Sequence, residues 1–212
     1  MVVKKKLVDI LNRIVKRLLD LCGSLVFLCI FSPVFLVISI MVRKKFGSPV
    51  LFRQKRTGLK GKPFTICKFR TMTNDRDGDG NPLPDGKRLV PFGEFLRRTS
   101  LDEIPEILNV VKGEMSLVGP RPLLVEYMER YSPEQKRRHT VKPGITGWAQ
   151  INGRNSVSWD ERFGMDLWYV DHWNIILDLK ILLITIIKVL KREGISAEGH
   201  VTMPEFRGGT KG

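Results

Sequence analysis

The chain has 212 residues, with 36 lysine and arginine residues against 22 acidic ones, and a formal net charge of +14 at pH 7. This length suits one globular domain, or one domain with an attached segment. The positive charge indicates a polyanionic neighbour, and nucleic acid, an anionic membrane and phosphorylated substrates are all candidates. The cysteines, at positions 22, 29 and 67, lack CxxC spacing, and the three histidines lie far apart. A disulfide framework and a zinc site are therefore not expected, and the cysteines are predicted to be reduced.

An uncharged apolar run extends from Leu21 to Val42. As a helix it would be roughly 33 Å long, which is enough to cross a hydrocarbon core of about 30 Å. It is too long for the apolar part of a cleaved signal peptide. Both flanks are basic, so a crossing helix would leave one cluster on the unfavourable side. The flanking residues are Lys4, Lys5, Lys6, Arg13, Lys16 and Arg17 before the run, and Arg43, Lys44 and Lys45 after it.

Ser32 and Pro33 lie at the centre of this run. Proline bends or breaks a helix, and the Ser32 hydroxyl could bond a carbonyl that the proline leaves free. A helix that enters the membrane, turns at Ser32-Pro33 and returns satisfies both basic flanks, while a kinked spanning helix is the alternative. Asp9 to Asp20 is predicted to be an amphipathic helix that lies along the membrane interface.

The next segments predict a small mixed domain. Ser48 to Gly58 reads as a strand and turn, and Pro63 to Met72 as a second strand, whose Lys68 faces either a site or solvent. Phe92 to Arg98 is predicted to be a short helix. Asp75 to Gly86 is a loop by its turn residues, and its spaced aspartates match only the first half of a calcium-binding loop. Position twelve is Gly86 where a bidentate glutamate is required, so calcium binding is not expected.

The most informative stretch begins at Ser100 and contains the adjacent carboxylates Asp102 and Glu103. Ser100 with Glu103 fits a capping box, or Asp102 is itself the N-cap, so helix capping is the simplest interpretation. A helix N-terminus is also an anion site, and Arg97 and Arg121 can add bidentate phosphate contacts. Two carboxylates beside such a site make sense if a divalent cation bridges them to phosphate, or if one attacks phosphorus.

The remaining elements are mostly helical. Leu123 to Arg138 is predicted to be a helix interrupted at Ser132-Pro133, and Lys142 to Arg154 a glycine-rich loop and strand. Trp159 to Trp173 is predicted to be a helix that carries Asp166, an acid that is more often a surface residue than a site residue. Ile175 to Leu190 is too short and too charged for a second span, and fits a helix at the membrane surface.

Four motifs in this order resemble the monotopic bacterial phosphoglycosyl transferases, the small bacterial sugar transferases. The resemblance covers nearly the whole chain. Within this family the chain is most similar to the diacetylbacillosaminyl-phosphate transferase type. The motifs are Ser32-Pro33, KFRTM from Lys68, SLDEIPEILNVVKGEMSLVGPRP from Ser100 to Pro122, and KPGITGWAQINGR from Lys142.

The resemblance implies an α-rich α/β fold with a re-entrant membrane helix broken at Ser32-Pro33, and a reaction that needs Mg²⁺. Asp102 would attack the β-phosphorus of a UDP-sugar and release UMP. The sugar would be an N-acetylated amino sugar such as diacetylbacillosamine. Undecaprenyl phosphate would then take the phosphosugar from Asp102. Glu103 would assist around the metal. Phosphate or nucleotide contacts are implied for Lys68, Arg97, Arg121, Pro122 and Asp166.

The expected organisation is a membrane region at 1–45, a catalytic domain at 46–190 and a loosely ordered tail at 191–212. The protein is expected on the cytoplasmic face of the bacterial membrane, in contact with lipids and without nucleic acid. A homodimer and association with downstream glycosyltransferases are left open. The rival hypotheses are a membrane-tethered module that binds nucleic acid or anionic lipid, and a structural membrane scaffold.

Overall fold

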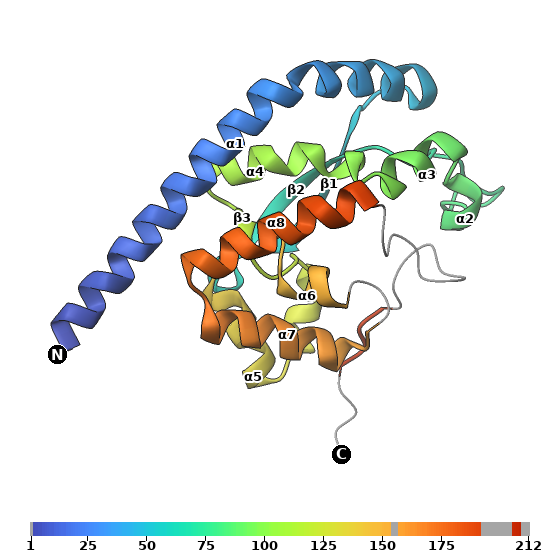
Figure 1. The fold of residues 1–212 in the computed structure, drawn as a ribbon. Helices are drawn as coiled ribbons and strands as arrows, with labels where there is room; N and C mark the ends of the chain where they lie inside the picture. The colour runs from blue at the N-terminus through green and yellow to red at the C-terminus, as the bar shows by residue number, and fades with distance from the viewer. Residues whose placement is uncertain (1, 154–156, 192–204, 209–212) are drawn as a thin grey trace.

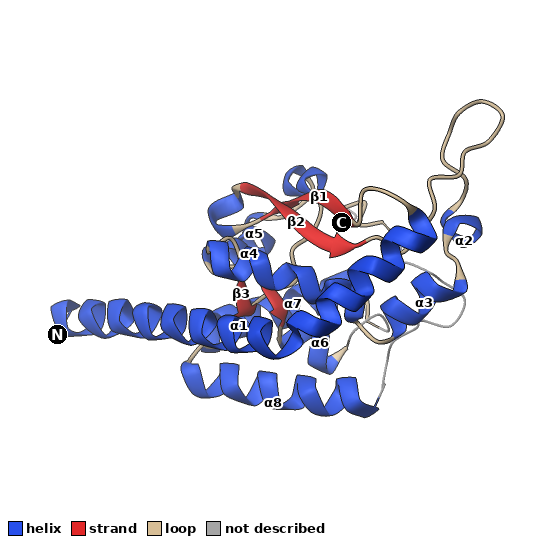
Figure 2. Cartoon of the chain, turned by 90° about the horizontal axis from the view of Figure 1, so that it is seen from above, coloured by secondary structure: helices blue, strands red, loops and turns tan. Residues whose placement is uncertain are grey.

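The computed structural model describes residues 2–153, 157–191 and 205–208. Helices dominate this part of the chain, and its named strands form two small sheets, β1 with β2 and β3 with β4. Figure 2 shows the strands among the helices, with the long first helix along one side. The α-rich α/β class expected from the sequence is confirmed.

The first helix, α1 (Val2–Phe46), is continuous, so the expected interruption at Ser32-Pro33 is wrong at the level of secondary structure. Figure 1 shows that the helix bends in its second half instead. Pro33 has no amide hydrogen for the carbonyl of Cys29, four residues earlier, and this loss bends a helix without ending it. The Ser32 hydroxyl donates to that same Cys29 carbonyl at 3.1 Å. The predicted compensation by Ser32 is confirmed.

α1 is the one helix in the described part of the chain that is long and apolar enough to cross a membrane. Its N-terminal half is attached to the rest of the protein. Arg17 donates to the carbonyls of Val110 at 2.6 Å and Val111 at 2.8 Å, near the C-terminal end of α4. Asp20 is buried and accepts a hydrogen bond from the Ser116 hydroxyl at 3.0 Å.

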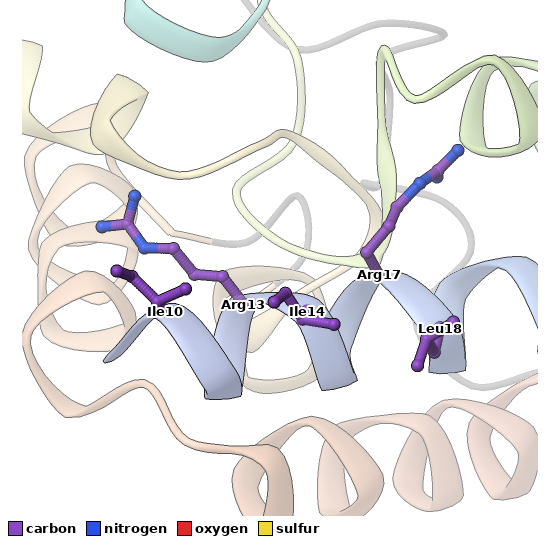
Figure 3. A pocket seen from close by; sticks show the side chains of 5 residues that line it. All are labelled: Ile10, Arg13, Ile14, Arg17 and Leu18. Carbon is purple, nitrogen blue, oxygen red and sulfur yellow. The ribbon is translucent and has the colours of Figure 1, made fainter. Parts of the chain in front are cut away.

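These contacts show that part of the basic face of residues 9–20 is turned toward the domain. Figure 3 shows Arg13 and Arg17 extending to the same side of α1, with Leu18 on the opposite side. Arg17 caps free carbonyls at a helix end, where a cation is favoured. A shallow pocket lies along this part of α1 and is lined by Ile10, Arg13, Ile14, Arg17 and Leu18.

The first sheet pairs β1 (Leu51–Thr57) with β2 (Pro63–Phe69) in antiparallel register, joined through the short 3-10 helix η1 (Leu59–Gly61). Both strands were predicted. Asn109, fully buried, attaches α4 to β2 because its side chain accepts from the Cys67 amide at 3.2 Å and donates to the Thr65 carbonyl at 2.8 Å. The amide thus satisfies two backbone groups at the edge of the sheet.

After β2 come α2 (Asp85–Arg88) and α3 (Pro91–Arg98), and α3 confirms the helix predicted for this stretch. A 3-10 helix, η2 (Leu101–Glu106), comes next, and α4 (Ile107–Lys112) continues directly from it. α3 lies so close to the end of β2 that a Cβ on Gly93 would be 1.8 Å from the Thr71 carbonyl oxygen.

The second sheet joins two of the sequence motifs through glycines. β3 (Ser116–Val118) pairs in parallel with β4 (Gly144–Thr146). A Cβ on Gly144 would lie 2.0 Å from the amide nitrogen of Gly119, and a Cβ on Gly147 would lie 2.2 Å from the Gly119 carbonyl oxygen. The end of the Ser100–Pro122 motif, at Gly119, and the motif that contains Gly144 therefore pack backbone against backbone.

The helix predicted for Leu123–Arg138 is wrong in its extent, but the interruption predicted at Ser132-Pro133 coincides with the start of a separate short helix. This stretch holds η3 (Val125–Glu129), α5 (Pro133–Lys136) and the start of η4 (Arg137–Thr140). Ser132 begins α5 with a capping box that includes Gln135, and Pro133 occupies the first turn, where its missing donor costs nothing.

The last helices are α6 (Trp148–Asn152), α7 (Trp159–His172) and α8 (Ile175–Lys191), of which α7 and α8 were predicted. α8 begins beside α1, where Lys16 and Asp178 form an ion pair at 2.5 Å. The expectation of a loosely ordered tail lies outside the described residues for 192–204 and 209–212. Within the described residues of this tail, Phe206 is buried in a core cluster.

Replacing Gly144 with alanine tests the glycine contact. We expect Gly144→Ala to lower the free energy of unfolding by at least about 2 kcal/mol, because its Cβ meets only backbone atoms, which cannot move aside easily. Gly164→Ala is the matched control, since Gly164 lies in α7 with nothing within 4 Å of its Cβ position. That variant should gain about 0.5–1 kcal/mol from helix propensity. Denaturant unfolding in detergent measures both, and equal stability of the two variants would contradict the packing.

Candidate active site

The adjacent carboxylates lie in η2, a tight 3-10 helix between α3 and α4. The predicted capping box is wrong, because Ser100 adopts a left-handed conformation with φ of 55° and its side chain makes no capping hydrogen bond. Asp102 is not an N-cap either, since it lies inside η2. The acids are therefore free for other contacts.

Glu103 is held between two cations from distant parts of the chain. Its Oε1 accepts from Lys68 Nζ at 2.6 Å and also from the Arg121 guanidinium. Lys68 comes from β2, and Arg121 from the loop after β3. Burial alone would raise the pKa of Glu103, but the charges of Arg121 and Lys68 outweigh it and hold this pKa below its usual range. Glu103 is therefore ionised at neutral pH.

Asp102 has the opposite environment. It is buried, and its carboxylate forms no hydrogen bond or ion pair with any residue that the structure describes. Burial, and then the charge of Glu103, raise the pKa of Asp102 to about 6, and nearby cations offset this only in part. The two neighbouring acids thus differ in kind, one paired and one unpaired, as in enzymes that divide roles between two carboxylates.

Glu106 is a site residue that the sequence reasoning missed. Its side chain is almost completely buried, and its Oε1 lies 3.0 Å from Lys68 Nζ. Burial raises the pKa of Glu106 to about 7, although the charge of Lys68 opposes the shift. A 3-10 helix has three residues per turn, so Glu103 and Glu106 lie on one side of η2. That spacing of three residues was the available signal, since it places both acids on one face of an α-helix as well as of a 3-10 helix.

Asp166 and Pro122 lie behind Arg121, away from open solvent. Both are buried. Asp166 accepts two hydrogen bonds from Arg138, at 3.0 Å to Nε and 2.7 Å to Nη2, and that same Nη2 donates to the Arg121 carbonyl at 2.8 Å. Asp166 thus reaches the carboxylates through Arg138 and Arg121 rather than by facing a ligand itself. Arg138 was not among the predicted site residues, because only the folded chain brings it to Arg121.

Arg97 and the Ser32-Pro33 pair complete the predicted set. Arg97 in α3 donates to the Thr71 hydroxyl at 3.0 Å, and its charge lowers the pKa of Asp102 without forming an ion pair with it. Ser32 and Pro33 lie on the exposed part of α1 and do not join this group. The structure therefore gathers Lys68, Arg97 and Arg121 around the two acids.

The carboxylate oxygens of this site suit Mg²⁺, which is often bound jointly by protein and substrate phosphate, better than a metal that protein side chains coordinate alone. Mg²⁺ prefers oxygen ligands and is usually bound by one or two carboxylates together with substrate phosphates. Asp102 offers an unpaired carboxylate beside Glu103. In the described part of the chain no group of three potential ligands has the geometry to hold a metal. A metal here would need oxygens from a bound phosphate.

Comparison with known proteins identifies the family. Residues 11–192 match the family model described as bacterial sugar transferase. The chain is 56% identical over 195 residues to an uncharacterized sugar transferase, EpsL, of Bacillus subtilis, covering 92% of this chain and 96% of that protein.

Other relatives carry names that state a reaction. The chain is 42% identical over 188 residues to the UDP-glucose:undecaprenyl-phosphate glucose-1-phosphate transferase of Escherichia coli, covering 84% of this chain and 40% of that protein. It is 37% identical over 200 residues to the undecaprenyl-phosphate galactose phosphotransferase of Salmonella typhimurium, covering 86% and 42%. The chain thus spans less than half of these two relatives. The resemblance drawn from the motifs is confirmed at the level of the family: the chain belongs to the bacterial sugar transferases.

Proposed function

We propose that the protein transfers a sugar-1-phosphate from a UDP-sugar to undecaprenyl phosphate and releases UMP. The observation that carries the proposal is the division between Asp102, which is unpaired, and Glu103, which two cations hold. The printed names of the glucose and galactose relatives state such a transfer for those proteins. A binding module or a scaffold has no need of an unpaired buried carboxylate next to a paired one.

In the proposed reaction, an Asp102 carboxylate oxygen attacks the β-phosphorus of the UDP-sugar. The bond between that phosphorus and the oxygen shared with the α-phosphate breaks, and UMP leaves with the electron pair. A phosphate oxygen of undecaprenyl phosphate then attacks the same phosphorus and frees Asp102. The covalent intermediate lets a soluble and a lipid substrate react in turn at one carboxylate.

The surrounding cations would orient and stabilise the phosphates. Arg121 presents a planar guanidinium, which suits bidentate contacts to phosphate oxygens, and Lys68 adds a point charge. Glu103 fixes both cations by the contacts described above. Its role in the proposal is to hold these groups and a metal in place, while Asp102 forms the bond.

Charge balance supports Mg²⁺ as the cofactor. Three carboxylates (Asp102, Glu103 and Glu106) face three cations (Lys68, Arg97 and Arg121). Arg56 adds a fourth cation near Glu106 and Arg121, so with the acids ionised the cluster has an excess of about one positive charge, less than the negative charge that a diphosphate brings. Asp102 and Glu103 would hold the metal, which when bound supplies positive charge to the transferring phosphoryl group.

Contacts at both ends of α1 favour a re-entrant membrane segment. Asp20 bonds Ser116, while Ile38 packs in a cluster with Phe69, so one folded domain binds both ends of the apolar run. Between residues 20 and 38 the helix rises only about 27 Å, less than a hydrocarbon core of about 30 Å. The exposed apolar residues around Pro33 would enter the bilayer, and both ends would stay on the cytoplasmic side.

α8 and the start of α1 supply further apolar surface for the membrane. Ile176 and Leu190 on α8 are 79% and 78% exposed, and Leu11 on α1 is 59% exposed. Arg13 lies among the apolar residues of the α1 pocket, a combination that suits a lipid headgroup region. This surface would place the carboxylates near the headgroup of the lipid substrate.

The choice of sugar is a separate part of the proposal. The motif resemblance favours an N-acetylated amino sugar such as diacetylbacillosamine, while the named relatives concern glucose and galactose. UMP release from a panel of UDP-sugars decides between these classes. Association as a homodimer or with downstream glycosyltransferases is proposed from the resemblance alone.

Asp102→Asn should lower UMP release at least about a thousandfold, because the amide cannot form the phosphoryl bond. Glu103→Gln should cost about a hundredfold, since the nucleophile remains but its supporting cations lose their anchor. Asp160→Asn, an exposed acid on α7, is the matched control and should keep wild-type activity. Mass spectrometry should find a phosphosugar adduct on the Asp102 peptide in wild type. Full UMP release by Asp102→Asn would contradict the assignment.

Removal of Mg²⁺ should abolish turnover, because the metal balances the charge of the diphosphate. UMP release is measured in EDTA and again after Mg²⁺ is restored. A second readout is independent of turnover: Mg²⁺ with UDP should raise the thermal midpoint of wild type more than that of Asp102→Asn. Undiminished activity in EDTA would rule out the metal.

The topology predicts that cysteines at both ends of α1 are protected from an impermeant reagent outside intact cells. Lys5→Cys and Lys45→Cys are compared, with the unmodified chain as the control for its native cysteines. Both should react only after the membrane is permeabilised, because both ends lie on the cytoplasmic side. Labelling of just one of them in intact cells means that α1 spans the membrane.

A further inference from the structure

A short segment near the C-terminus is packed into the domain behind the candidate active site. Phe206 is 3% exposed and lies in a cluster of aromatic rings. Its ring centroid is 5.0 Å from that of Phe163, 5.6 Å from that of Tyr131 and 5.5 Å from that of Tyr127. These distances are those of favourable aromatic pairs, each worth more than the buried area alone.

The backbone of this segment is fixed as well. The Phe206 amide donates to the Tyr127 hydroxyl at 3.2 Å, and its carbonyl accepts from Arg130. Arg130 also pairs with Glu205 at 2.7 Å and lies over the Tyr127 ring at 5.4 Å. The hydrogen bonds of its amide and carbonyl thus fix the backbone of Phe206, and with it the position of the ring.

Two rings of the same cluster enclose the buried guanidinium of Arg138. The guanidinium carbon of Arg138 lies 5.7 Å from the ring centre of Phe163 and 6.0 Å from that of Tyr131. Both distances are within the range of cation–π attraction, which is strongest where water is excluded. Arg138 in turn pairs with Asp166 and donates to the Arg121 carbonyl.

We propose that Phe206 is a positioning residue for Arg121. The contacts run from Phe206 to Tyr131 and Phe163, from these rings to Arg138, and from Arg138 to the backbone of Arg121. The guanidinium of Arg121 then contacts Glu103. Removal of the Phe206 ring would leave a void against both rings, and neighbouring groups relax only partly into such voids. The inference rests on the proposed function, since Arg121 matters there as a phosphate ligand.

The kinetic test compares Phe206→Ala, Phe206→Tyr and Leu177→Ala in the full chain. Phe206→Ala should lower kcat/KM for the UDP-sugar about tenfold, and Phe206→Tyr, which keeps the ring, should restore most of it. Leu177→Ala removes apolar packing from a separate core cluster and controls for general loss of stability. It should keep wild-type kcat/KM at a temperature where all variants are folded, as checked by their thermal midpoints.

Arg138→Lys provides a coupling test. The losses in kcat/KM from Phe206→Ala and Arg138→Lys should be less than multiplicative when combined, because both act through the same guanidinium. Independent losses that multiply fully would overturn the inference, as would a wild-type kcat/KM in folded Phe206→Ala.

Hydrogen exchange separates this inference from the proposed function. In Phe206→Ala, amides near Arg121 should exchange faster than in wild type, while those of β2 around Cys67, held by Asn109, should be unchanged. Unchanged exchange near Arg121 overturns the inference whether or not the protein turns over. Absence of wild-type turnover with every UDP-sugar, together with faster exchange in the variant, would overturn the proposed function and leave the positioning contact standing.

Discussion

The arrangement around the carboxylates depends on the side chain of Glu103. This one carboxylate accepts from Lys68 and from Arg121, which come from strand β2 and from the loop after β3. Without it Arg121 would lose its carboxylate partner and Lys68 would keep only Glu106, and an uncompensated charge in a partly buried place is destabilising. The ion pairs of Glu103 therefore hold three parts of the chain together.

The same contact explains why Asp102 is left unpaired. Lys68 and Arg121 are committed to Glu103, and Arg97 bonds Thr71. Burial, and then the negative charge of Glu103, raise the pKa of Asp102. A buried carboxylate with no partner lowers stability, since burial penalises its charge. Such a group persists where the surrounding structure fixes it, as Asn109 does by tying α4 to β2. The local cost fits a reactive group better than a structural one.

The parts of this fold that the sequence predicts are those that local patterns determine. β1, β2, α3, α7 and α8 follow from alternation, turn residues and helical periodicity. The Asp102-Glu103 pair stood out because adjacent acids next to arginines are visible in a linear chain. Ser100 was wrongly interpreted as a helix cap, because serine is a common N-cap residue, whereas its backbone here is left-handed. Nothing in the local sequence reveals a positive φ at a serine.

Long-range contacts were beyond the reach of those patterns. Arg138 and Arg121 are 17 residues apart in sequence, and Arg138 and Asp166 are 28 apart. Phe206, which follows α8 in the sequence, packs against the aromatic rings that lie over Arg138. Their importance comes from burial and pairing, which only the folded chain creates. Glu106 is the exception, because its spacing of three residues from Glu103 places both acids on one face of either kind of helix.

The charges of α1 show how one helix can serve both the domain and a membrane. Lys16 and Arg17 are bound to the domain, so part of the positive charge of the chain is structural and does not face lipid. Many of the residues left exposed on α1 are apolar, and those from Leu25 to Val37 lie between the two stretches that the domain holds. Electrostatic attraction to headgroups therefore counts for less than the total of +14 suggests. Apolar burial of the exposed faces of α1 and α8 would dominate membrane binding, since each buried apolar side chain contributes about 1.5–3 kcal/mol.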